Sequence, residues 1–212
     1  MGSIKNIIFD FGGVIIPVDQ MAYASGMIDL GCRDIAGLHE KFLQQEVYVR
    51  FEKGEMSPGE FRSWLRTGLD NHVTNDQLDQ VWNSMLGKIQ PQRVWFLESL
   101  KKAYRTFLLS NTNIIHYNYY NDLFCKTFGY HSLGNLFEKA YYSYRIGLYK
   151  PDPVIFEYVL EDSGLDPDET IFIDDNLQNV KAAEECGITA LQLTDIESLD
   201  DLIFSATKAQ RH

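Results

Sequence analysis

The sequence predicts an α/β protein with a Rossmann-like core, in which a parallel five-stranded core sheet is combined with an inserted helical bundle. Two observations lead to this prediction. Over residues 1–16 and 91–212, short apolar runs alternate with helical patterns, which is typical of a parallel sheet covered by helices on both faces. Over residues 17–90 only helical patterns occur, so this segment is expected to form a second, all-helical domain.

The first predicted strand covers Ile7–Phe9 and leads directly into Asp10, which Phe11 and two glycines follow. Consecutive apolar residues are typical of a parallel strand that is buried on both faces. Gly12 and Gly13 allow a tight turn and a close approach of the backbone to a ligand. Because ligands of open α/β sheets bind at the carboxyl ends of the strands, Asp10 is a candidate site residue. An aspartate that only begins a turn gives the same local pattern.

The segment 17–90 contains two strong helix signals. Ser57–Glu60 and Thr74–Gln77 each match a capping box, in which the first side chain bonds to the fourth backbone amide and the fourth side chain bonds back. Apolar residues recur at helical spacing after each box. Weaker helical patterns cover residues 21–30 and 34–48, so a bundle of about four helices is expected.

From Pro91 onward helices and strands alternate again. The predicted helices cover residues 91–103, 114–128 and 197–208, with two more that end at Gly164 and Gly187. The predicted strands cover residues 106–109, 139–143, 170–173 and 188–193. Together with the first strand, they account for the five strands of the core sheet.

Composition argues against several classes of function. The formal net charge of −11 disfavours a nucleic-acid or anionic-membrane partner, since both bind basic surfaces. No apolar run is long enough to cross a bilayer, and no signal peptide is recognisable. Cys32, Cys125 and Cys186 are far apart and form no CxxC motif, which is typical of reduced thiols and predicts a cytoplasmic protein.

Polar residues follow several of the predicted strands. Asp10, Ser110–Asn111 and Asp174–Asp175 stand directly after strands, and Lys150 lies in a loop after another. Parallel strands bring these ends together at one edge of the sheet. Carboxylates suit Mg²⁺, which prefers oxygen ligands, while a hydroxyl, backbone amides and a lysine suit a phosphoryl group. Alternatively, Lys150 is a solvated surface lysine and Asp174–Asp175 cap a helix.

The order and spacing of these motifs resemble those of the haloacid dehalogenase-like hydrolase superfamily. Asp-x-Gly-Gly-Val at residue 10 is followed by Ser-Asn-Thr 100 residues later, Lys-Pro-Asp 40 further on and Asp-Asp 24 beyond. The resemblance covers nearly the whole chain. It implies a core domain of residues 1–16 and 91–212 and a helical cap domain of residues 17–90. Residues 51–57 and 110–113 look most similar to bacterial α-D-glucose-1-phosphate phosphatases within the superfamily.

The resemblance also implies an activity, a cofactor and roles for individual residues. The activity is that of a Mg²⁺-dependent phosphatase acting on a small phosphorylated metabolite, such as a sugar 1-phosphate. Asp10 is then the nucleophile that forms an aspartyl-phosphate, and Lys150 pairs with it. The implied metal ligands are Asp10, the backbone carbonyl of Gly12, Asp175 and, through water, Asp174. The implied phosphate-binding residues are Ser110, Asn111 and Lys150.

Gly12 departs from the usual motif of the superfamily, which has a second aspartate here to protonate the leaving oxygen and later activate water. A positioned acid or base contributes about 10²–10⁴-fold. A phosphatase whose leaving group needs little protonation fits this change, and the glucose-1-phosphate phosphatases also carry glycine here. A metal-independent haloacid dehalogenase is a second interpretation, against which Asp174–Asp175 argues. A phosphate-binding or regulatory protein that has lost catalysis is the third.

A few further residues have more than one interpretation. Asp19 and Glu52 are candidates to replace the missing acid, although a hinge turn and a helix surface are the simpler interpretations. His116 lies near the second motif in sequence, but we expect a solvated helix residue. Asn179 stands where many relatives carry a further aspartate, and we assign it no role.

Overall fold

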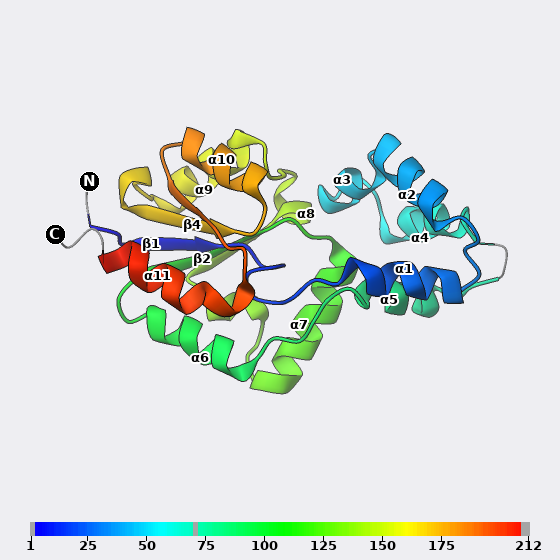
Figure 1. The fold of residues 1–212 in the computed structure, drawn as a ribbon, viewed down its shortest axis with the longest axis horizontal. Coiled ribbons are helices and arrows are strands. Elements are labelled where there is room, and N and C mark those ends of the chain that lie inside the picture. Colours follow the sequence, from blue (N-terminus) through cyan, green and yellow to red (C-terminus); the bar gives the residue numbers. More distant parts are fainter. Residues whose placement is uncertain (1–2, 70–71, 209–212) are drawn as a thin grey trace.

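The computed structural model describes residues 3–69 and 72–208, and its centre is a five-stranded parallel sheet (Figure 1). The strands are β1 (Asn6–Phe9), β2 (Arg105–Ser110), β3 (Lys139–Tyr142), β4 (Thr170–Asp174) and β5 (Thr189–Gln192). Their order across the sheet is β3-β2-β1-β4-β5, and each neighbouring pair is parallel. Each strand begins and ends within one residue of its predicted bounds. The predicted fold class is therefore confirmed.

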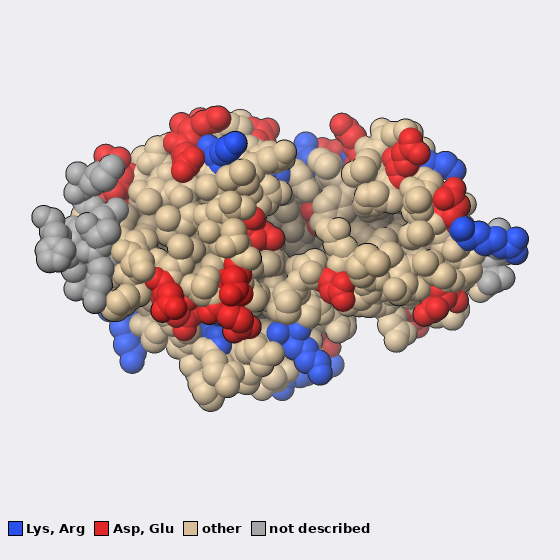
Figure 2. Space-filling model, viewed as in Figure 1, with Lys and Arg blue, Asp and Glu red and all other residues tan. Residues whose placement is uncertain are grey.

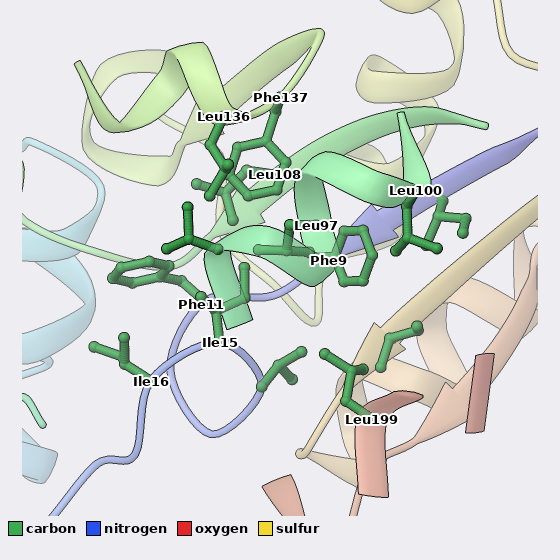
Figure 3. Packing of buried hydrophobic residues seen from close by; sticks show 14 of the residues in the cluster. Phe9, Phe11, Ile15, Ile16, Leu97, Leu100, Leu108, Leu136, Phe137 and Leu199 are labelled. Atoms are coloured by element: carbon green, nitrogen blue, oxygen red, sulfur yellow. The ribbon is translucent and has the colours of Figure 1, made fainter. Parts of the chain in front are cut away.

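The helices of the core lie on both faces of this sheet. They are α6 (Pro91–Leu100), α7 (Ile114–Phe128), α8 (Ser143–Ile146), α9 (Pro153–Ser163), α10 (Leu177–Glu185) and α11 (Leu199–Lys208). Successive side chains of β1 point to opposite faces: Ile7 and Phe9 join an apolar cluster with α6, α7 and α11 (Figure 3), whereas Ile8 packs with α9 and α10. All four residues of β1 are buried, which explains its continuous apolar pattern.

Between β1 and α6 the described residues form five helices. They are α1 (Gln20–Asp29), α2 (Ile35–Gln44), α3 (Val47–Glu52), α4 (Pro58–Arg66) and α5 (Asn75–Asn83). The prediction of about four helices was one short, because Glu46 adopts a left-handed conformation with φ 50° and separates α2 from α3. Both predicted capping boxes are present, at Ser57 and at Thr74.

The helical part has an apolar cluster of its own. The cluster is built around Phe51, Phe61 and Trp82, and Ile115 of α7 joins it from the core. The two connections to the core run side by side, because Asp19 N donates to Met85 O at 2.8 Å and Gly87 N donates to Pro17 O at 2.9 Å. These contacts hold the helical part beside the carboxyl end of β1 (Figure 1).

None of the helices in residues 3–69 and 72–208 combines the length and the apolar character that a bilayer crossing requires.

Candidate active site

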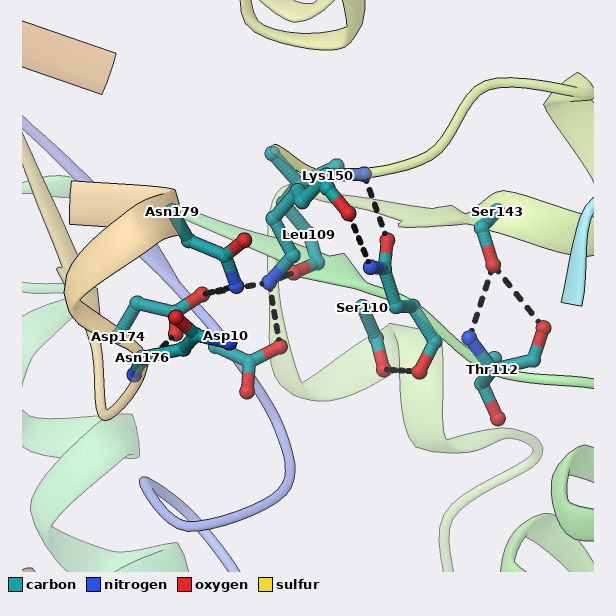
Figure 4. A network of polar contacts seen from close by, with 10 residues as sticks. Asp10, Leu109, Ser110, Thr112, Ser143, Lys150, Asp174, Asn176 and Asn179 are labelled. Atoms are coloured by element: carbon teal, nitrogen blue, oxygen red, sulfur yellow. Dashed lines mark hydrogen bonds and ion pairs between the residues drawn. The ribbon is translucent and has the colours of Figure 1, made fainter. Parts of the chain in front are cut away.

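Lys150 lies buried between two carboxylates from neighbouring strands. Asp10 follows β1 and Asp174 ends β4, and these two strands pair in the sheet. Lys150 Nζ is 2.6 Å from Asp10 Oδ1 and 2.7 Å from Asp174 Oδ2 (Figure 4). It also donates to the Leu109 carbonyl at 2.9 Å, so all three ammonium protons are bonded. Lys150 is only 1% exposed, and the surface-lysine interpretation is therefore wrong.

Asp174 is fully buried, and both of its oxygens accept hydrogen bonds from the protein. Oδ1 accepts from Asn176 N at 2.8 Å, and Oδ2 accepts from Lys150 Nζ and from Asn179 Nδ2 at 2.9 Å. These contacts favour a role in positioning Lys150, and the role of water-mediated metal ligand stays a prediction. The helix-cap interpretation of Asp174–Asp175 is wrong, since Asn176 caps α10.

Asn179 belongs to the site, although the sequence analysis assigned it no role. It lies in the first turn of α10, so its amide turns back toward the strand end that precedes the helix (Figure 4). A polar residue five positions after a strand-terminal aspartate is the only sequence signal of this contact.

The carboxylates of Asp10, Asp174 and Asp175 form a group of oxygen donors. Each offers one oxygen, and these three atoms lie within 4.8 Å of one another. Asp10 and Asp174 are buried, whereas Asp175 is exposed. A group of oxygen ligands with one open side fits a hard divalent cation that also binds a ligand.

Gly13 provides the space that Asp175 occupies. Its φ is +76°, and a Cβ atom built on it lies 2.4 Å from Asp175 Oδ2. Both the backbone conformation and the contact therefore require glycine at this position.

Replacing Gly13 by alanine is expected to lower the free energy of unfolding by more than the roughly 1–2 kcal/mol of left-handed backbone strain. Gly147→Ala is the matched control, because Gly147 has φ +72° and its Cβ would meet no atom within 4 Å. Urea denaturation of both variants compares the losses. Equal losses would mean that Asp175 does not need this space.

Ser110 ends β2 and Asn111 follows it directly. The Asn111 side chain pairs with the backbone of Lys150: Nδ2 donates to Lys150 O at 2.9 Å, and Oδ1 accepts from Lys150 N at 3.0 Å. Asn111 therefore fixes the loop that carries Lys150. Among the residues that the structure describes, Ser110 Oγ makes only a long contact of 3.5 Å with Asn111 O, so its hydroxyl group remains available to a ligand.

A cavity of about 630 Å³ opens beside these strand ends, between the core and the helical part. Figure 2 shows the surface hollowed at this place. The predicted site residues that line it are Asp10, Gly12, Ser110, Asn111, Lys150 and Asp175. Asp174 does not line the cavity. It contacts Lys150, which does. Asp19 lies exposed at the cavity and caps α1.

Glu52 and His116 also line the cavity, although a solvated helix surface was expected for both. That expectation was wrong, since Glu52 is 1% exposed and His116 is 6% exposed. The periodicity of apolar residues identifies the helix face that packs against neighbouring helices. Glu52 of α3 and His116 of α7 lie instead on helix faces that line the cavity between the helical part and the core. Tyr48 and Tyr149 line the same cavity and were not predicted as site residues.

Burial changes the protonation of these groups. It raises the pKa of Glu52 to about 8, and hydrogen bonding by Tyr48 and Tyr149 offsets only part of the effect. Burial lowers the pKa of His116 to about 3, so the imidazole is neutral at pH 7. Burial also raises the pKa of Asp10 to about 7, against the opposing effect of Lys150. A cation at the site would favour the ionised form of Asp10.

The free energy of unfolding is expected to fall as the pH rises from about 4.5 to about 8. In this range the unfolded chain ionises Glu52 while the folded protein keeps its proton, so the folded state binds more protons. Glu52→Gln should remove the contribution of Glu52, about 2–4 kcal/mol between pH 4.5 and pH 8, and should leave the contribution of Asp10, whose pKa burial also raises. Urea denaturation at several pH values measures the difference between the variant and the wild type. The control Glu55→Gln changes a surface carboxyl and should follow the wild type, and a fall as steep in Glu52→Gln as in the wild type would contradict the account.

Comparisons with known proteins agree with this geometry. The model of the haloacid dehalogenase-like hydrolase family matches residues 4–187. A D-ribitol-5-phosphate phosphatase from Bacteroides thetaiotaomicron is 32% identical over 189 residues, which is 89% of this chain and 91% of that protein. A sesquiterpene phosphatase from Aspergillus oryzae is 25% identical over 197 residues and 91% of each chain.

A solved structure supports the same relationship. An enzyme of this family from Bacteroides thetaiotaomicron, in complex with magnesium and inorganic phosphate, superposes with a TM-score of 0.80 and 38% identity. The match covers 89% of this chain and 93% of that one. Since the family model also spans most of the sequence, the chain belongs to the haloacid dehalogenase-like hydrolases.

Proposed function

We propose that this protein is a Mg²⁺-dependent phosphatase that hydrolyses the phosphate ester of a small sugar or sugar alcohol through an aspartyl-phosphate on Asp10. The observation that carries the proposal is the contact of Lys150 with both Asp10 and Asp174 at the open end of the sheet. The related D-ribitol-5-phosphate phosphatase and the related enzyme with bound magnesium and phosphate support it.

The donor set fits Mg²⁺. Asp10 and Asp175 supply carboxylate oxygens close to each other, and Gly12 lines the same cavity and would add its backbone carbonyl. When bound, Mg²⁺ would neutralise charge on the oxygens of the transferring phosphoryl group.

The residues of the chain account for the two chemical steps. Lys150 binds Asp10 Oδ1 and so leaves Oδ2 free to attack phosphorus. That attack forms the Asp10 oxygen–phosphorus bond and breaks the bond from phosphorus to the leaving oxygen, which takes up a proton from solvent water. The Ser110 hydroxyl donates a hydrogen bond to a phosphoryl oxygen. A second water then attacks phosphorus and gives up a proton to solvent, which breaks the bond to Asp10, regenerates its carboxylate and releases inorganic phosphate.

The substrate class follows from two separate arguments. Gly12 offers no acid to protonate the leaving oxygen, which favours an ester of an acidic hydroxyl group, such as a sugar 1-phosphate. The related phosphatase acts on D-ribitol 5-phosphate, which favours a phosphorylated sugar alcohol as the substrate.

We also propose that residues 17–90 act as a cap that closes the cavity and excludes water. In addition, we propose that the protein is cytoplasmic, and its free cysteines support this location.

Release of inorganic phosphate from a panel of monoesters tests the proposal, with Mg²⁺ and with EDTA. The panel contains D-ribitol 5-phosphate, sugar 1-phosphates and sugar 6-phosphates. We expect turnover of at least one ester with Mg²⁺ and its loss with EDTA. Full activity in EDTA would contradict the metal requirement. Binding of phosphate without turnover of any ester would identify a binding protein that has lost catalysis.

A further inference from the structure

Three buried polar atoms near the cavity have no hydrogen-bond partner among the described residues. They are Glu52 Oε2, Asn113 Nδ2 and His116 Nε2. Each buried polar atom that stays unpaired costs roughly 1–3 kcal/mol. Atoms of this kind are uncommon in folded proteins, and a group of them beside a cavity indicates a missing ligand.

The three side chains lie next to one another. Asn113 caps α7 and accepts from His116 N at 3.0 Å, which ties it to the first turn of that helix. Asn113 also lies close enough to Glu52 to influence the pKa of that carboxyl. Glu52 and His116 line the cavity that contains Asp10 and Lys150. Two of the three side chains therefore line the cavity that contains the phosphate-binding residues, and Asn113 lies beside them.

Contacts behind the cavity hold these side chains in place. The imidazole of His116 stacks on Trp82 with ring centroids 4.9 Å apart and an interplanar angle of 5°. Its Nδ1 is 2.8 Å from the Asn83 side-chain oxygen, which can only accept, so Nδ1 carries the proton and Nε2 is an acceptor. Asn113 Oδ1 is likewise bonded, to His116 N and to Trp82 Nε1. The protein therefore fixes His116 and Asn113 through these atoms and leaves His116 Nε2 and Asn113 Nδ2 without a partner among the described residues.

A hydroxyl group, which donates one hydrogen bond and accepts others, is the ligand that these atoms match. His116 Nε2 accepts, Asn113 Nδ2 donates, and a carboxyl group at Glu52 can take either role. An apolar leaving group would leave all three atoms unpaired. Sites built to bind a hydroxyl group discriminate strongly against analogues that lack it. The related phosphatases act on both kinds of alcohol, a sugar alcohol in one case and a sesquiterpene in the other.

We propose that Glu52, Asn113 and His116 form a subsite for the hydroxyl groups of the leaving group, and that this subsite selects phosphorylated sugars and sugar alcohols over phosphate esters of apolar alcohols. The inference rests on the proposed phosphatase function and names the part of the cavity that sets its specificity.

The variant His116→Phe tests the subsite, because phenylalanine keeps a ring that can stack on Trp82 and removes the Nε2 acceptor. We expect kcat/KM for D-ribitol 5-phosphate to fall by about 10–100-fold, and kcat/KM for para-nitrophenyl phosphate, which has no hydroxyl on its leaving group, to change by less than about twofold. Glu52→Gln should lower the first value and spare the second. His39→Phe makes the same substitution on the exposed surface of α2 and should alter neither.

Equal losses on both esters would show a structural role for His116 and overturn the proposal, as would an unchanged kcat/KM for D-ribitol 5-phosphate. Calorimetric titration in the Asp10→Asn background separates this outcome from failure of the phosphatase function, because this variant should bind the ester without hydrolysing it. Asp10→Asn should bind D-ribitol 5-phosphate more tightly than inorganic phosphate, and the double variant with His116→Phe should lose that difference. Equal affinity of Asp10→Asn for the two ligands would overturn the subsite even if the wild type is an active phosphatase.

Discussion

Replacing Asp10 by asparagine is expected to reduce phosphate release by at least about 10⁴-fold. An amide cannot attack phosphorus to form an acyl-phosphate, and no other described carboxylate of the cavity holds the same contact with Lys150. The variant should remain folded, since Lys150 keeps its bonds to Asp174 and to the Leu109 carbonyl. Phosphate release and circular dichroism of the same preparation measure the two effects.

Asp122→Asn is the matched control for this experiment. Asp122 is exposed on α7 and pairs with Lys126 in the next turn, so the same chemical change should leave activity within about twofold. Wild-type activity in Asp10→Asn would show that another group is the nucleophile.

Replacing Lys150 by methionine is expected to lower the free energy of unfolding by about 3–5 kcal/mol at pH 7. Methionine keeps most of the side-chain volume but leaves Asp10 and Asp174 buried without a cation. Burial raises the pKa of Asp10, so this carboxyl is protonated at pH 5 and no longer needs a cation beside it. The loss of unfolding free energy should therefore be smaller at pH 5 than at pH 7. Urea denaturation at both pH values measures the effect, and activity should be lost as well.

Lys139→Met is the control for burial. Lys139 pairs with Asp162 at the surface, where the two side chains are 48% and 32% exposed, and such a pair is worth less than about 1 kcal/mol. Losses of the same size in the two variants would mean that the buried position of Lys150 has no energetic consequence.

The fold and the strand-end residues could be predicted from the sequence because both depend on local patterns. The apolar run before Asp10 identifies a strand that is buried on both faces, as β1 is. Parallel strands then place Asp10, Ser110 and Asp174 at one edge whatever the intervening segments contain. The family resemblance assigned roles to these residues. In the structure Asp10 and Ser110 line one cavity with Lys150, and Asp174 contacts Lys150.

The rest of the site could not be predicted in this way. Glu52 of α3 and His116 of α7 have the spacing and polarity of surface residues, but both are buried where the helical part and the core meet. Asn179 contacts Asp174 because α10 begins directly after β4, which a sequence pattern does not specify. The division of α2 from α3 depends on the left-handed conformation of Glu46, an uncommon choice for a residue other than glycine.

Detection of the covalent intermediate tests the central claim most directly. Wild-type protein is mixed with a hydrolysed ester and Mg²⁺, quenched in acid within milliseconds, digested and analysed by mass spectrometry. The account predicts a phosphoryl group on the peptide that contains Asp10, stable in acid and released by hydroxylamine, and its absence from Asp10→Asn. Turnover by the wild type with the phosphoryl group on another residue would contradict the assignment of Asp10 as the nucleophile.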